Sequence, residues 1–451
     1  MIFLHNTLTG KREKFKPIRG KRVGFYTCGP TAYDYAHIGN LRTYIFEDIL
    51  KRTLLLNNFS VRHVMNITDV DDKTIKKSLE ENKPLKVLTS RYAKAFKEDL
   101  KKLNIVRPDK FAPATLYIKE IISAIKKLIE KKFAYQKGSS VYFRIKKFSG
   151  YGQLSRIRQR DLKTGATVDV DEYDKDNPAD FVLWKARTEK DGNNFWKSPW
   201  GNGRPGWHIE CSVIAAKELG QPFDIHAGGV DLIFPHHENE IARAEAVSGK
   251  RFVNYWLHGE HLLVDGQKMA KSLNNFLTLR DLEERGFSSL VYRYFVMQAH
   301  YRSKLNFTWQ ALSAAQNALK KIWVAARDLP VPRGKCGELE KRFGAAIDDD
   351  LNMPEALAVL WELLKSNYPK QAVAASLLRF DKVLGLDISR YLSRKLKLPK
   401  RVSDILKKRD KARRANDWTT ADNLRKKLAR MGYEVEDTPE GCRVVKSTFA
   451  T

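Results

Sequence analysis

Cysteine, histidine and glutamate side chains that could bind a metal ion occur at three places in the sequence. In the segment FPHHENEIA a proline precedes an expected helix, and His236 and Glu240 are four residues apart, on one helix face. An imidazole and a carboxylate at this spacing can hold one Zn²⁺ ion, with Cys28 and Cys211 as candidate thiolate ligands. His237 competes with His236 as the nitrogen ligand. Taken alone, the fragment is better interpreted as a helix start with solvated histidines, because spacing does not place the distant cysteines.

Two other segments combine glycine or lysine with a position where phosphate could bind. His37, Gly39 and Asn40 follow the apolar segment RVGFYTC, at the expected start of a helix. Backbone N–H groups at a helix N-terminus attract phosphate, and glycine permits its close approach. Lys268 and Lys271 belong to a basic segment, KMAKS. Taken alone, the first segment is better interpreted as a capping turn and the second as an exposed basic turn.

A strand–helix–strand unit is expected around the first of these segments. The residue pattern predicts strands at 22–28 and 61–67 and an amphipathic helix at 41–56. Such a unit implies an α/β fold with a parallel sheet, whose ligand site lies at the carboxyl ends of its strands. The loop after Cys28 falls at this edge. Two more amphipathic helices are expected at 85–103 and 116–133.

The rest of the chain changes character twice. Residues 146–200 carry a basic stretch, an acidic stretch and a Trp-, Gly- and Pro-rich stretch, which predict an irregular insertion in the sheet domain. The sheet pattern resumes with FDIHAGG and NYWLHGEHLLV, and residues 282 to 386 are nearly all helical in period. Residues 390–430 hold 16 Lys or Arg against four Asp, which makes this tail the most basic part of the chain.

Length and charge narrow the classes of function. The 451 residues correspond to about three folding units. A net charge of +29 favours a large anionic partner, either nucleic acid or a membrane. No stretch approaches the roughly 18 consecutive apolar residues of a spanning helix, and the N-terminus turns polar too soon for a signal peptide. With only four dispersed cysteines, we expect a soluble, cytoplasmic protein without a membrane partner.

Six segments occur in the order and spacing seen in the cysteinyl-tRNA synthetases, which the chain resembles over nearly its whole length. They are FYTCGPTAYDYAHIGN, NITDVDDK, FVLWK, SPWGNGRPGWHIECS, FDIHAGGVDLIFPHHENEIA and DGQKMAKSLNNF. The resemblance implies a Rossmann-type parallel-sheet catalytic domain at 1–260 with an insertion at about 141–205. It further implies a region at 261–305 that carries the KMSKS loop and contacts the tRNA stem, an α-helical bundle at 306–395, and a small anticodon-recognition module at 396–451.

The same resemblance implies one zinc ion per chain. In that family a cysteine of CGPT, one of WHIECS, and the first histidine and last glutamate of PHHENE bind zinc, which here are Cys28, Cys211, His236 and Glu240, in preference to His237. Zinc suits the selection of cysteine. A steric pocket separates substrates that differ by one small group by only about 1–3 kcal/mol. A thiol with a pKa of about 8.5 is readily deprotonated to bind a metal, whereas the hydroxyl of serine competes poorly.

HIGN and KMAKS resemble the paired HIGH and KMSKS signatures of class I aminoacyl-tRNA synthetases. Asn40 replaces the second histidine but keeps a side-chain donor, and Ala270 replaces an uncharged serine. The resemblance assigns catalysis to His37, Asn40, Lys268 and Lys271, ATP contacts to His37, Gly39, Asn40, Gly228, Asp231 and Lys271, and substrate contacts to Thr68, Trp207 and His208. It implies a monomer that activates L-cysteine with ATP and Mg²⁺ and transfers it to the 3′-terminal adenosine of tRNA(Cys).

The segment KARRANDWTTADNLRKKLARMGYEVEDTPEGCRV is similar to the module that reads the anticodon in bacterial members of the family. Arg413, Arg414, Arg425 and Lys426 can neutralise phosphates there. Trp418 can stack on an unpaired base, although packing in the small core of the module is the expectation for this side chain.

Two other functions stay open on the sequence. A cysteine ligase of the mycothiol pathway resembles the same catalytic domain and zinc site but joins cysteine to an amino sugar, and it lacks a basic anticodon-reading tail. A non-catalytic, zinc-stabilised RNA-binding protein would explain the departure at Asn40, but it would not need the KMAKS segment.

Overall fold

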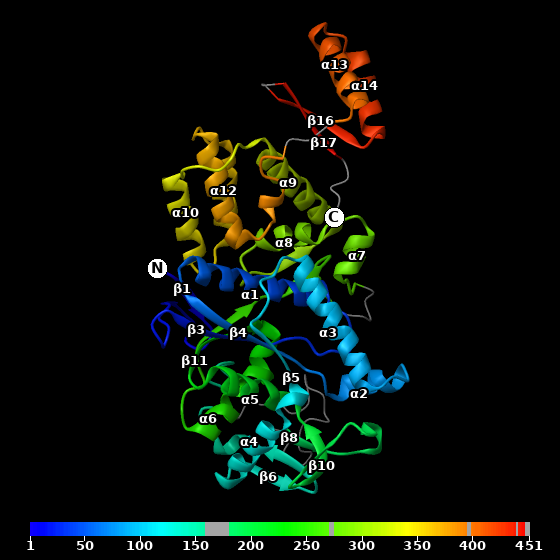
Figure 1. The fold of residues 1–451 in the computed structure, drawn as a ribbon. Coiled ribbons are helices and arrows are strands. Elements are labelled where there is room, and N and C mark those ends of the chain that lie inside the picture. Colours follow the sequence, from blue (N-terminus) through cyan, green and yellow to red (C-terminus); the bar gives the residue numbers. More distant parts are fainter. Residues whose placement is uncertain (158–179, 270–274, 395–397, 439–440, 447–451) are drawn as a thin grey trace.

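A five-stranded parallel sheet forms the centre of the computed structural model, which describes residues 1–157, 180–269, 275–394, 398–438 and 441–446 (Figure 1). The strand order is β12-β11-β3-β4-β5, and every neighbouring pair is parallel. The strands are β3 (Arg22–Thr27), β4 (Ser60–Ile67), β5 (Lys110–Pro113), β11 (Phe223–Gly229) and β12 (Val253–Gly259). The expected parallel α/β sheet is therefore confirmed.

Helix α1 (Ile38–Leu56) connects β3 to β4 and covers one face of the sheet (Figure 1). Successive residues of β3 point to opposite faces, so Phe25 belongs to the core shared with α1 and Tyr26 to the core on the other face. The helix begins three residues earlier than the pattern predicts, at Ile38. The reason is a capping box in which His37 and Asn40 bind each other's backbone N–H.

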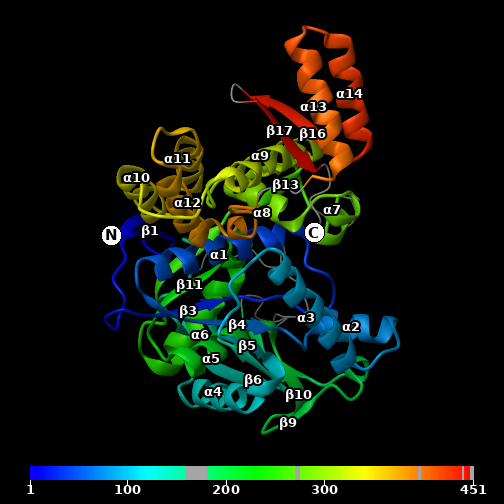
Figure 2. The same ribbon diagram turned by 45° about the horizontal axis from the view of Figure 1, so that its top comes forward.

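The opposite face of the sheet is covered by three helices, α4 (Ile118–Glu130), α5 (Trp207–Leu219) and α6 (Glu238–Ser248) (Figures 1 and 2). The helix α3 (Leu85–Lys102) follows α2 (Asp72–Glu80) beside the edge of the sheet. The helices expected at 85–103 and 116–133 are thus confirmed, each with ends shifted by three residues or fewer. A short antiparallel hairpin, β1 (Phe3–Asn6) and β2 (Lys11–Lys14), begins the chain.

The insertion contains a second sheet, so the expectation of an irregular segment is wrong for its described part. Its order is β6-β7-β8-β10-β9, all antiparallel, with β6 (Ala134–Lys137), β7 (Ser140–Phe143), β8 (Phe181–Ala186), β9 (Trp196–Ser198) and β10 (Gly201–Pro205). Glycine in β10 serves close strand approach, since a Cβ at Gly203 would lie 2.3 Å from the carbonyl oxygen of Lys185. The basic and acidic stretches fall largely at 158–179, outside the described residues.

The second half of the chain is mainly helical, as expected. It contains α7 (Leu279–Glu284), α8 (Ser289–Met297), α9 (Trp309–Asp328), α10 (Gly337–Asp348), α11 (Met353–Lys365) and α12 (Lys370–Leu384). In the three-stranded sheet β14-β13-β15, β13 (Leu262–Val264) and β14 (Gln267–Lys268) precede the region 282–386 that was expected to be helical, and β15 (Leu305–Phe307) interrupts it. The described residues include no helix that is both long and apolar enough to cross a bilayer.

A small module ends the chain and stands apart from the sheet domain (Figures 1 and 2). It consists of α13 (Lys400–Arg414), α14 (Trp418–Arg430) and the hairpin of β16 (Tyr433–Thr438) and β17 (Gly441–Lys446), around its own core. The ammonium of Lys320 on α9 binds the carboxylate of Glu434 on β16. This ion pair joins the module to the helical region.

A buried ion pair joins the sheet domain to the helical region. Arg293 on α8 lies 2.6 Å from Asp48 on α1, and both side chains are completely buried. The same guanidinium donates to the carbonyl oxygens of Leu103 and Leu384, at the ends of α3 and α12. Arg293 of α8 thus connects its own helix with α1, α3 and α12.

Replacement of Arg293 by methionine should lower the free energy of unfolding by about 3 kcal/mol, because Asp48 loses a partner inside a dry interface. The exposed pair of Arg342 and Glu362 provides the control, since solvent screens this pair and Arg342→Met should cost much less stability than Arg293→Met. Urea unfolding followed by tryptophan fluorescence measures both. Equal losses in the two variants would contradict the role given to Arg293.

Candidate functional site

A cleft of about 260 Å³ lies at the carboxyl edge of the parallel sheet. Its lining brings together residues far apart in the sequence: Cys28, Gly29, Pro30, Thr31, Tyr33, Asp34, Tyr35, Ala36, His37, Asn40, Thr43, Tyr44, Lys73, Trp207, Gly228, Gly229, Asp231, Leu232 and Phe276. The loop after β3 supplies the first part of this lining and the end of β11 another. A cleft is thus present at the edge of the sheet where the ligand site was expected.

The loop after β3 is held tightly against the end of β4. The backbone N–H of Gly29 donates to Oδ1 of Asn66 at 2.8 Å. A Cβ at Gly29 would lie 1.8 Å from the carbonyl oxygen of Asn66, so no other residue fits this position without a shift of the backbone. This close approach fixes where the neighbouring Cys28 side chain points.

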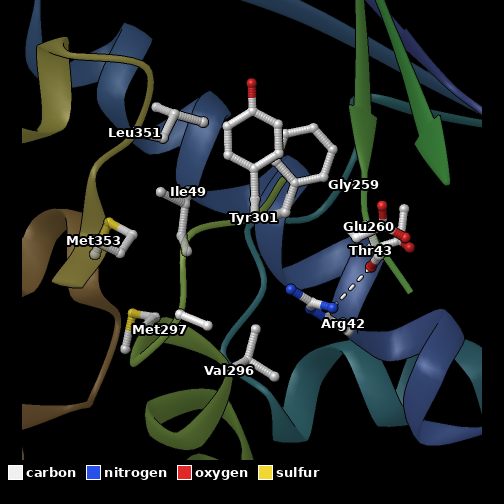
Figure 3. A pocket seen from close by; sticks show the side chains of 12 residues that line it. Arg42, Thr43, Ile49, Gly259, Glu260, Val296, Met297, Tyr301, Leu351 and Met353 are labelled. Atoms are coloured by element: carbon white, nitrogen blue, oxygen red, sulfur yellow. Dashed lines mark hydrogen bonds between the residues drawn. The ribbon is translucent and has the colours of Figure 1, made fainter. Parts of the chain in front are cut away.

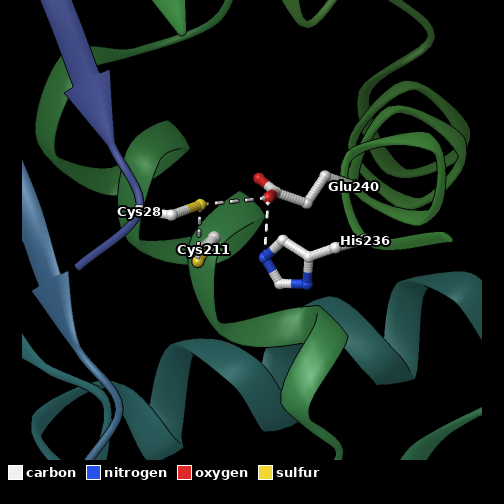
Figure 4. Close-up of side chains that lie close together, drawn as sticks. All are labelled: Cys28, Cys211, His236 and Glu240. Atoms are coloured by element: carbon white, nitrogen blue, oxygen red, sulfur yellow. Dashed lines mark hydrogen bonds and ion pairs between the residues drawn. The ribbon is translucent and has the colours of Figure 1, made fainter. Parts of the chain in front are cut away.

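Cys28, Cys211, His236 and Glu240 lie together as one buried cluster beneath the cleft (Figure 4). The Sγ atoms of Cys28 and Cys211 are 3.8 Å apart, and Sγ of Cys28 is 3.9 Å from Oε1 of Glu240. Nε2 of His236 is 3.1 Å from the same carboxylate oxygen. All four ligand atoms lie within 4.8 Å of one another. Cys28 is the member that also lines the cleft.

These separations suit a tetrahedral ion. Two thiolate sulfurs at about 2.3 Å from zinc are about 3.8 Å apart in tetrahedral geometry, which is the separation of the two Sγ atoms here. Two thiolates, one imidazole and one carboxylate form a donor set that binds Zn²⁺ in preference to hard cations such as Mg²⁺. The residues present therefore fit Zn²⁺.

The pKa values of the cluster show how its negative charge is balanced by protons. Burial opposes ionisation of Cys211, but hydrogen bonds with Cys28 and His236 lower its pKa to about 6. Burial likewise opposes ionisation of Glu240, yet His226 and His236 lower its pKa to about 2. Burial lowers the pKa of His236, but Cys211 and Glu240 outweigh it and raise the pKa to about 9. The imidazolium of His236 thus occupies the place where a bound cation would balance the anionic donors.

Histidines outside this set orient it. Nδ1 of His208 lies 3.1 Å from Nδ1 of His236, on the side of the ring away from Glu240. Nε2 of His226 lies 3.2 Å from Oε2 of Glu240. Both histidine side chains are completely buried, so they hold the ligands in place from behind.

His237 offers a second possible donor set, formed by Cys28, His226, His237 and Glu240. Nε2 of His237 lies 3.4 Å from Sγ of Cys28 but 4.0 Å from Oε1 of Glu240. Its Nδ1 is 2.8 Å from Nε2 of His258. Because this set has one thiolate instead of two, it is the weaker site for zinc.

The two sets can be distinguished by substitution. His236→Asn should reduce bound zinc, measured by inductively coupled plasma mass spectrometry after gel filtration, from one ion per chain to well below half. His237→Asn is the matched control, one residue away and equally buried, and should keep the ion. Loss of zinc in the second variant but not in the first would assign the site to the other donor set.

The first turn of α1 forms the other part of the cleft. Nδ1 of His37 accepts the backbone N–H of Asn40 at 3.0 Å, and Oδ1 of Asn40 accepts the backbone N–H of His37 at 3.3 Å. Since Nδ1 of a neutral His37 accepts, its Nε2 carries the hydrogen. In the side-chain amide of Asn40, Oδ1 is the acceptor, so the nitrogen is the donor. The capping turn expected for this segment therefore exists and also presents donors that suit phosphate oxygens.

The structure separates the other expected site residues into two groups. Gly228, Asp231 and Trp207 line the cleft, and the indole of Trp207 stacks on His236 with ring centroids 4.4 Å apart. Thr68 and His208 are buried below the cleft and do not line it. The hydroxyl of Thr68 donates to Glu210 at 2.8 Å, beside a cluster cysteine.

The basic segment after the cleft is described only in part. Lys268 lies exposed on β14, and Met269 approaches the position of Gly39, where a Cβ would be 3.3 Å from Cε of the methionine. Ala270 and Lys271 lie outside the described residues. Lys73 was not singled out from the sequence, although it ends the segment NITDVDDK. It is exposed and lines the cleft, which only the position of the β4–α2 loop shows.

In the C-terminal module, Arg414, Arg425 and Lys426 are exposed. The guanidinium of Arg413 binds Asp437 and lies 5.6 Å from the ring centroid of Trp418. The expectation that Trp418 packs in the core is wrong, because 57% of this residue is exposed. At the first position of α14 it precedes the face that packs on α13, so the small core closes without it.

Three family models match the chain. The model described as the tRNA synthetases class I (C) catalytic domain matches residues 14–317. A DALR domain matches residues 342–388, and the cysteinyl-tRNA ligase anticodon binding domain matches residues 396–444. The first match alone spans the parallel sheet, the insertion, the cleft and the buried cluster.

Curated relatives match along the full length. The cysteine–tRNA ligase of Chlamydia felis is 47% identical over 470 residues, covering 99% of this chain and 98% of the relative. That of Chlamydia pneumoniae is 46% identical over 467 residues, covering 98% of each. Among solved structures, Mycobacterium tuberculosis methionyl-tRNA synthetase in complex with methionyl-adenylate has a TM-score of 0.57 at 14% identity, covering 83% of this chain and 92% of that one. That likeness concerns the fold.

Proposed function

The chain belongs to the cysteinyl-tRNA synthetases, ATP-dependent ligases of class I, and from this membership we propose how its residues carry out the reaction. In the first step a carboxylate oxygen of L-cysteine attacks the α-phosphorus of ATP, and pyrophosphate leaves as cysteinyl adenylate forms. In the second step the 2′-hydroxyl of the terminal adenosine of tRNA(Cys) attacks the carbonyl carbon, and AMP leaves. ATP enters as its Mg²⁺ complex.

One observation carries this proposal: a single cleft is lined both by Cys28 of the buried cluster and by His37 and Asn40 at the start of α1. A cysteine whose thiol lies at the cluster can therefore direct its carboxylate toward phosphate held at the helix. Adenylate formation depends mainly on such positioning and on charge neutralisation, so no general base is required.

Cys28, Cys211, His236 and Glu240 would hold the zinc ion. When bound, the ion supplies a soft Lewis acid that favours a thiolate over the hydroxyl of serine or the methyl group of alanine. The protein residues do the rest of the selection. Trp207 stacks on His236 and lines the cleft beside Cys28, so its indole bounds the space for the substrate side chain. His208 supports the ligand His236 from below, and Thr68 binds Glu210, the residue next to the ligand Cys211.

ATP would be bound at the first turn of α1 and at the end of β11. Nε2–H of His37 and the amide of Asn40 donate to phosphate oxygens, while Gly39 leaves room for the imidazole of His37, which a Cβ there would approach to 3.0 Å. The backbone of Gly228 and the carboxylate of Asp231 face the adenosine from the other side of the cleft. Lys268 and Lys271 would neutralise charge on the departing pyrophosphate.

The C-terminal module would read the anticodon. Arg414, Arg425 and Lys426 are exposed cations for phosphate contacts, and Arg413 beside Trp418 extends the same surface. The exposed indole of Trp418 is a stacking platform for an unpaired base, which is the usual mode of recognition for single-stranded RNA.

The proposal is tested by cysteine-dependent exchange of pyrophosphate into ATP, followed by charging of tRNA(Cys) in the same preparation. Both are expected, and charging should fall steeply between 50 and 200 mM salt while exchange changes little, because only charging needs the basic module. Exchange without charging would favour the amino-sugar ligase. Absence of exchange would leave a non-catalytic RNA-binding protein.

Zinc selection has its own test. Cys211→Ser should lose the metal and raise KM for cysteine by at least about tenfold, while KM for ATP changes less than about twofold, because the two subsites share no ligand. Cys336→Ser is the matched control, since this cysteine is buried in the helical region at the start of α10. Unchanged KM for cysteine in the metal-free variant would refute selection by the metal.

A further inference from the structure

Arg42 on α1 is a buried arginine whose side chain donates to four backbone carbonyl groups. Its Nη1 donates to the carbonyl oxygen of Glu260 at 2.8 Å and to that of His261 at 2.5 Å, and its Nη2 donates to the carbonyl oxygens of His300 and Ser303. Only 3% of the residue is exposed. We propose that Arg42 is a positioning residue for adenylate formation, a role that rests on the function proposed above.

The two segments that Arg42 binds lead into β13 and β15, two strands of the sheet whose third strand, β14, carries Lys268. Glu260 and His261 connect β12 to β13, which pairs with β14 and hence with Lys268. The segment 300–303 leads into β15, which pairs with β13 on its other side. Because one guanidinium is hydrogen-bonded to the segments that precede β13 and β15, these strands cannot move relative to α1 without breaking those hydrogen bonds.

The start of α1 contacts the residues that follow the KMAKS segment. The backbone N–H of Ile38 donates to the carbonyl oxygen of Leu277 at 2.8 Å, and the rings of His37 and Phe276 meet edge to face. Arg42 lies four residues after Ile38, one turn further along the helix. The same two turns of α1 therefore carry HIGN and fix the described residues on both sides of 270–274.

The guanidinium is suited to this task because its five N–H groups form a rigid fork that reaches several acceptors at once. Lysine has a single ammonium group on a flexible stem, and glutamine has one amide with two N–H donors. Figure 3 shows Arg42 beside a small cavity of about 20 Å³, bounded by Ile49, Met297, Tyr301 and Met353. A shorter side chain would enlarge this cavity and leave carbonyl groups without a donor.

The role predicts coupling between Arg42 and Lys268. Arg42→Gln should lower kcat of pyrophosphate exchange by about 10- to 100-fold, the effect of misplacing a reacting group by about 1 Å. Arg42→Lys should lose less. KM for cysteine and zinc content should stay unchanged, because the hydrogen bonds of this side chain go to the backbone of residues 260–261 and 300–303 and not to the buried cluster. In a Lys268→Ala background, Arg42→Gln should cost less than about threefold, since it acts through that lysine.

Arg52→Gln is the matched control. Arg52 lies on the same helix, and its guanidinium also donates to backbone carbonyls, those of Asn104 and Lys382, at the end away from the cleft. Its loss should affect stability, and any loss of rate should be equal with and without Lys268. Rates are normalised to the fraction of chains that form adenylate in a single turnover, which removes misfolded protein from the comparison.

The outcomes separate the two proposals. If the unmodified chain catalyses exchange but Arg42→Gln lowers it equally in both backgrounds, or raises KM for cysteine instead of lowering kcat, the role of Arg42 is overturned and the proposed function stands. If the unmodified chain catalyses no exchange, the proposed function fails, and the inference about Arg42 fails with it.

Discussion

The parallel pairing of β3 with β4 and β11 is the constraint on which the site depends. Parallel strands end at the same edge, so the residues that follow β3 and β4 and the last residues of β11 come together although they are far apart in the chain. Cys28 follows β3, Thr68 follows β4, and Gly228 lies at the end of β11. The isolated bridge between Thr31 and Thr68 continues this alignment beyond the strands. A cleft at this edge is the geometric result, and helix α1 begins inside it.

Charge compensation is the second requirement, because the cluster beneath the cleft is buried. A carboxylate and a thiolate in a buried interior need positive charge beside them, and the raised pKa of His236 favours its protonated form there. A bound cation would take over that role and release protons. The surrounding residues are arranged for such an exchange, since His208 and His226 hold His236 and Glu240 in place.

Helix α1 connects these features with the rest of the molecule. Its first turn lines the cleft, Arg42 binds the segments that enter β13 and β15, and Asp48 forms the buried ion pair with Arg293 of the helical region. Because α1 is one continuous helix, it fixes the strand that carries Lys268 in position relative to the parallel sheet. The basic C-terminal module joins this body through the ion pair of Lys320 and Glu434 and stands apart from the parallel sheet (Figure 1). This module carries part of the positive charge of the chain on the exposed side chains of Arg414, Arg425 and Lys426.

The sequence by itself determined which elements and donors exist. Hydrophobic periodicity predicted the strand–helix–strand unit and most helices, and the order of the motifs indicated the family, because both are local properties of the chain. The same reasoning failed in the insertion, where glycine marks close strand pairing, and at Trp418, whose exposure depends on whether α13 covers it. Only the tertiary structure brought Cys28 next to Cys211, 183 residues away, and placed Lys73 in the cleft and Arg42 between two distant segments. These arrangements depend on strand order and helix packing, and the spacing of residues along a chain does not encode distances between elements that meet only after folding.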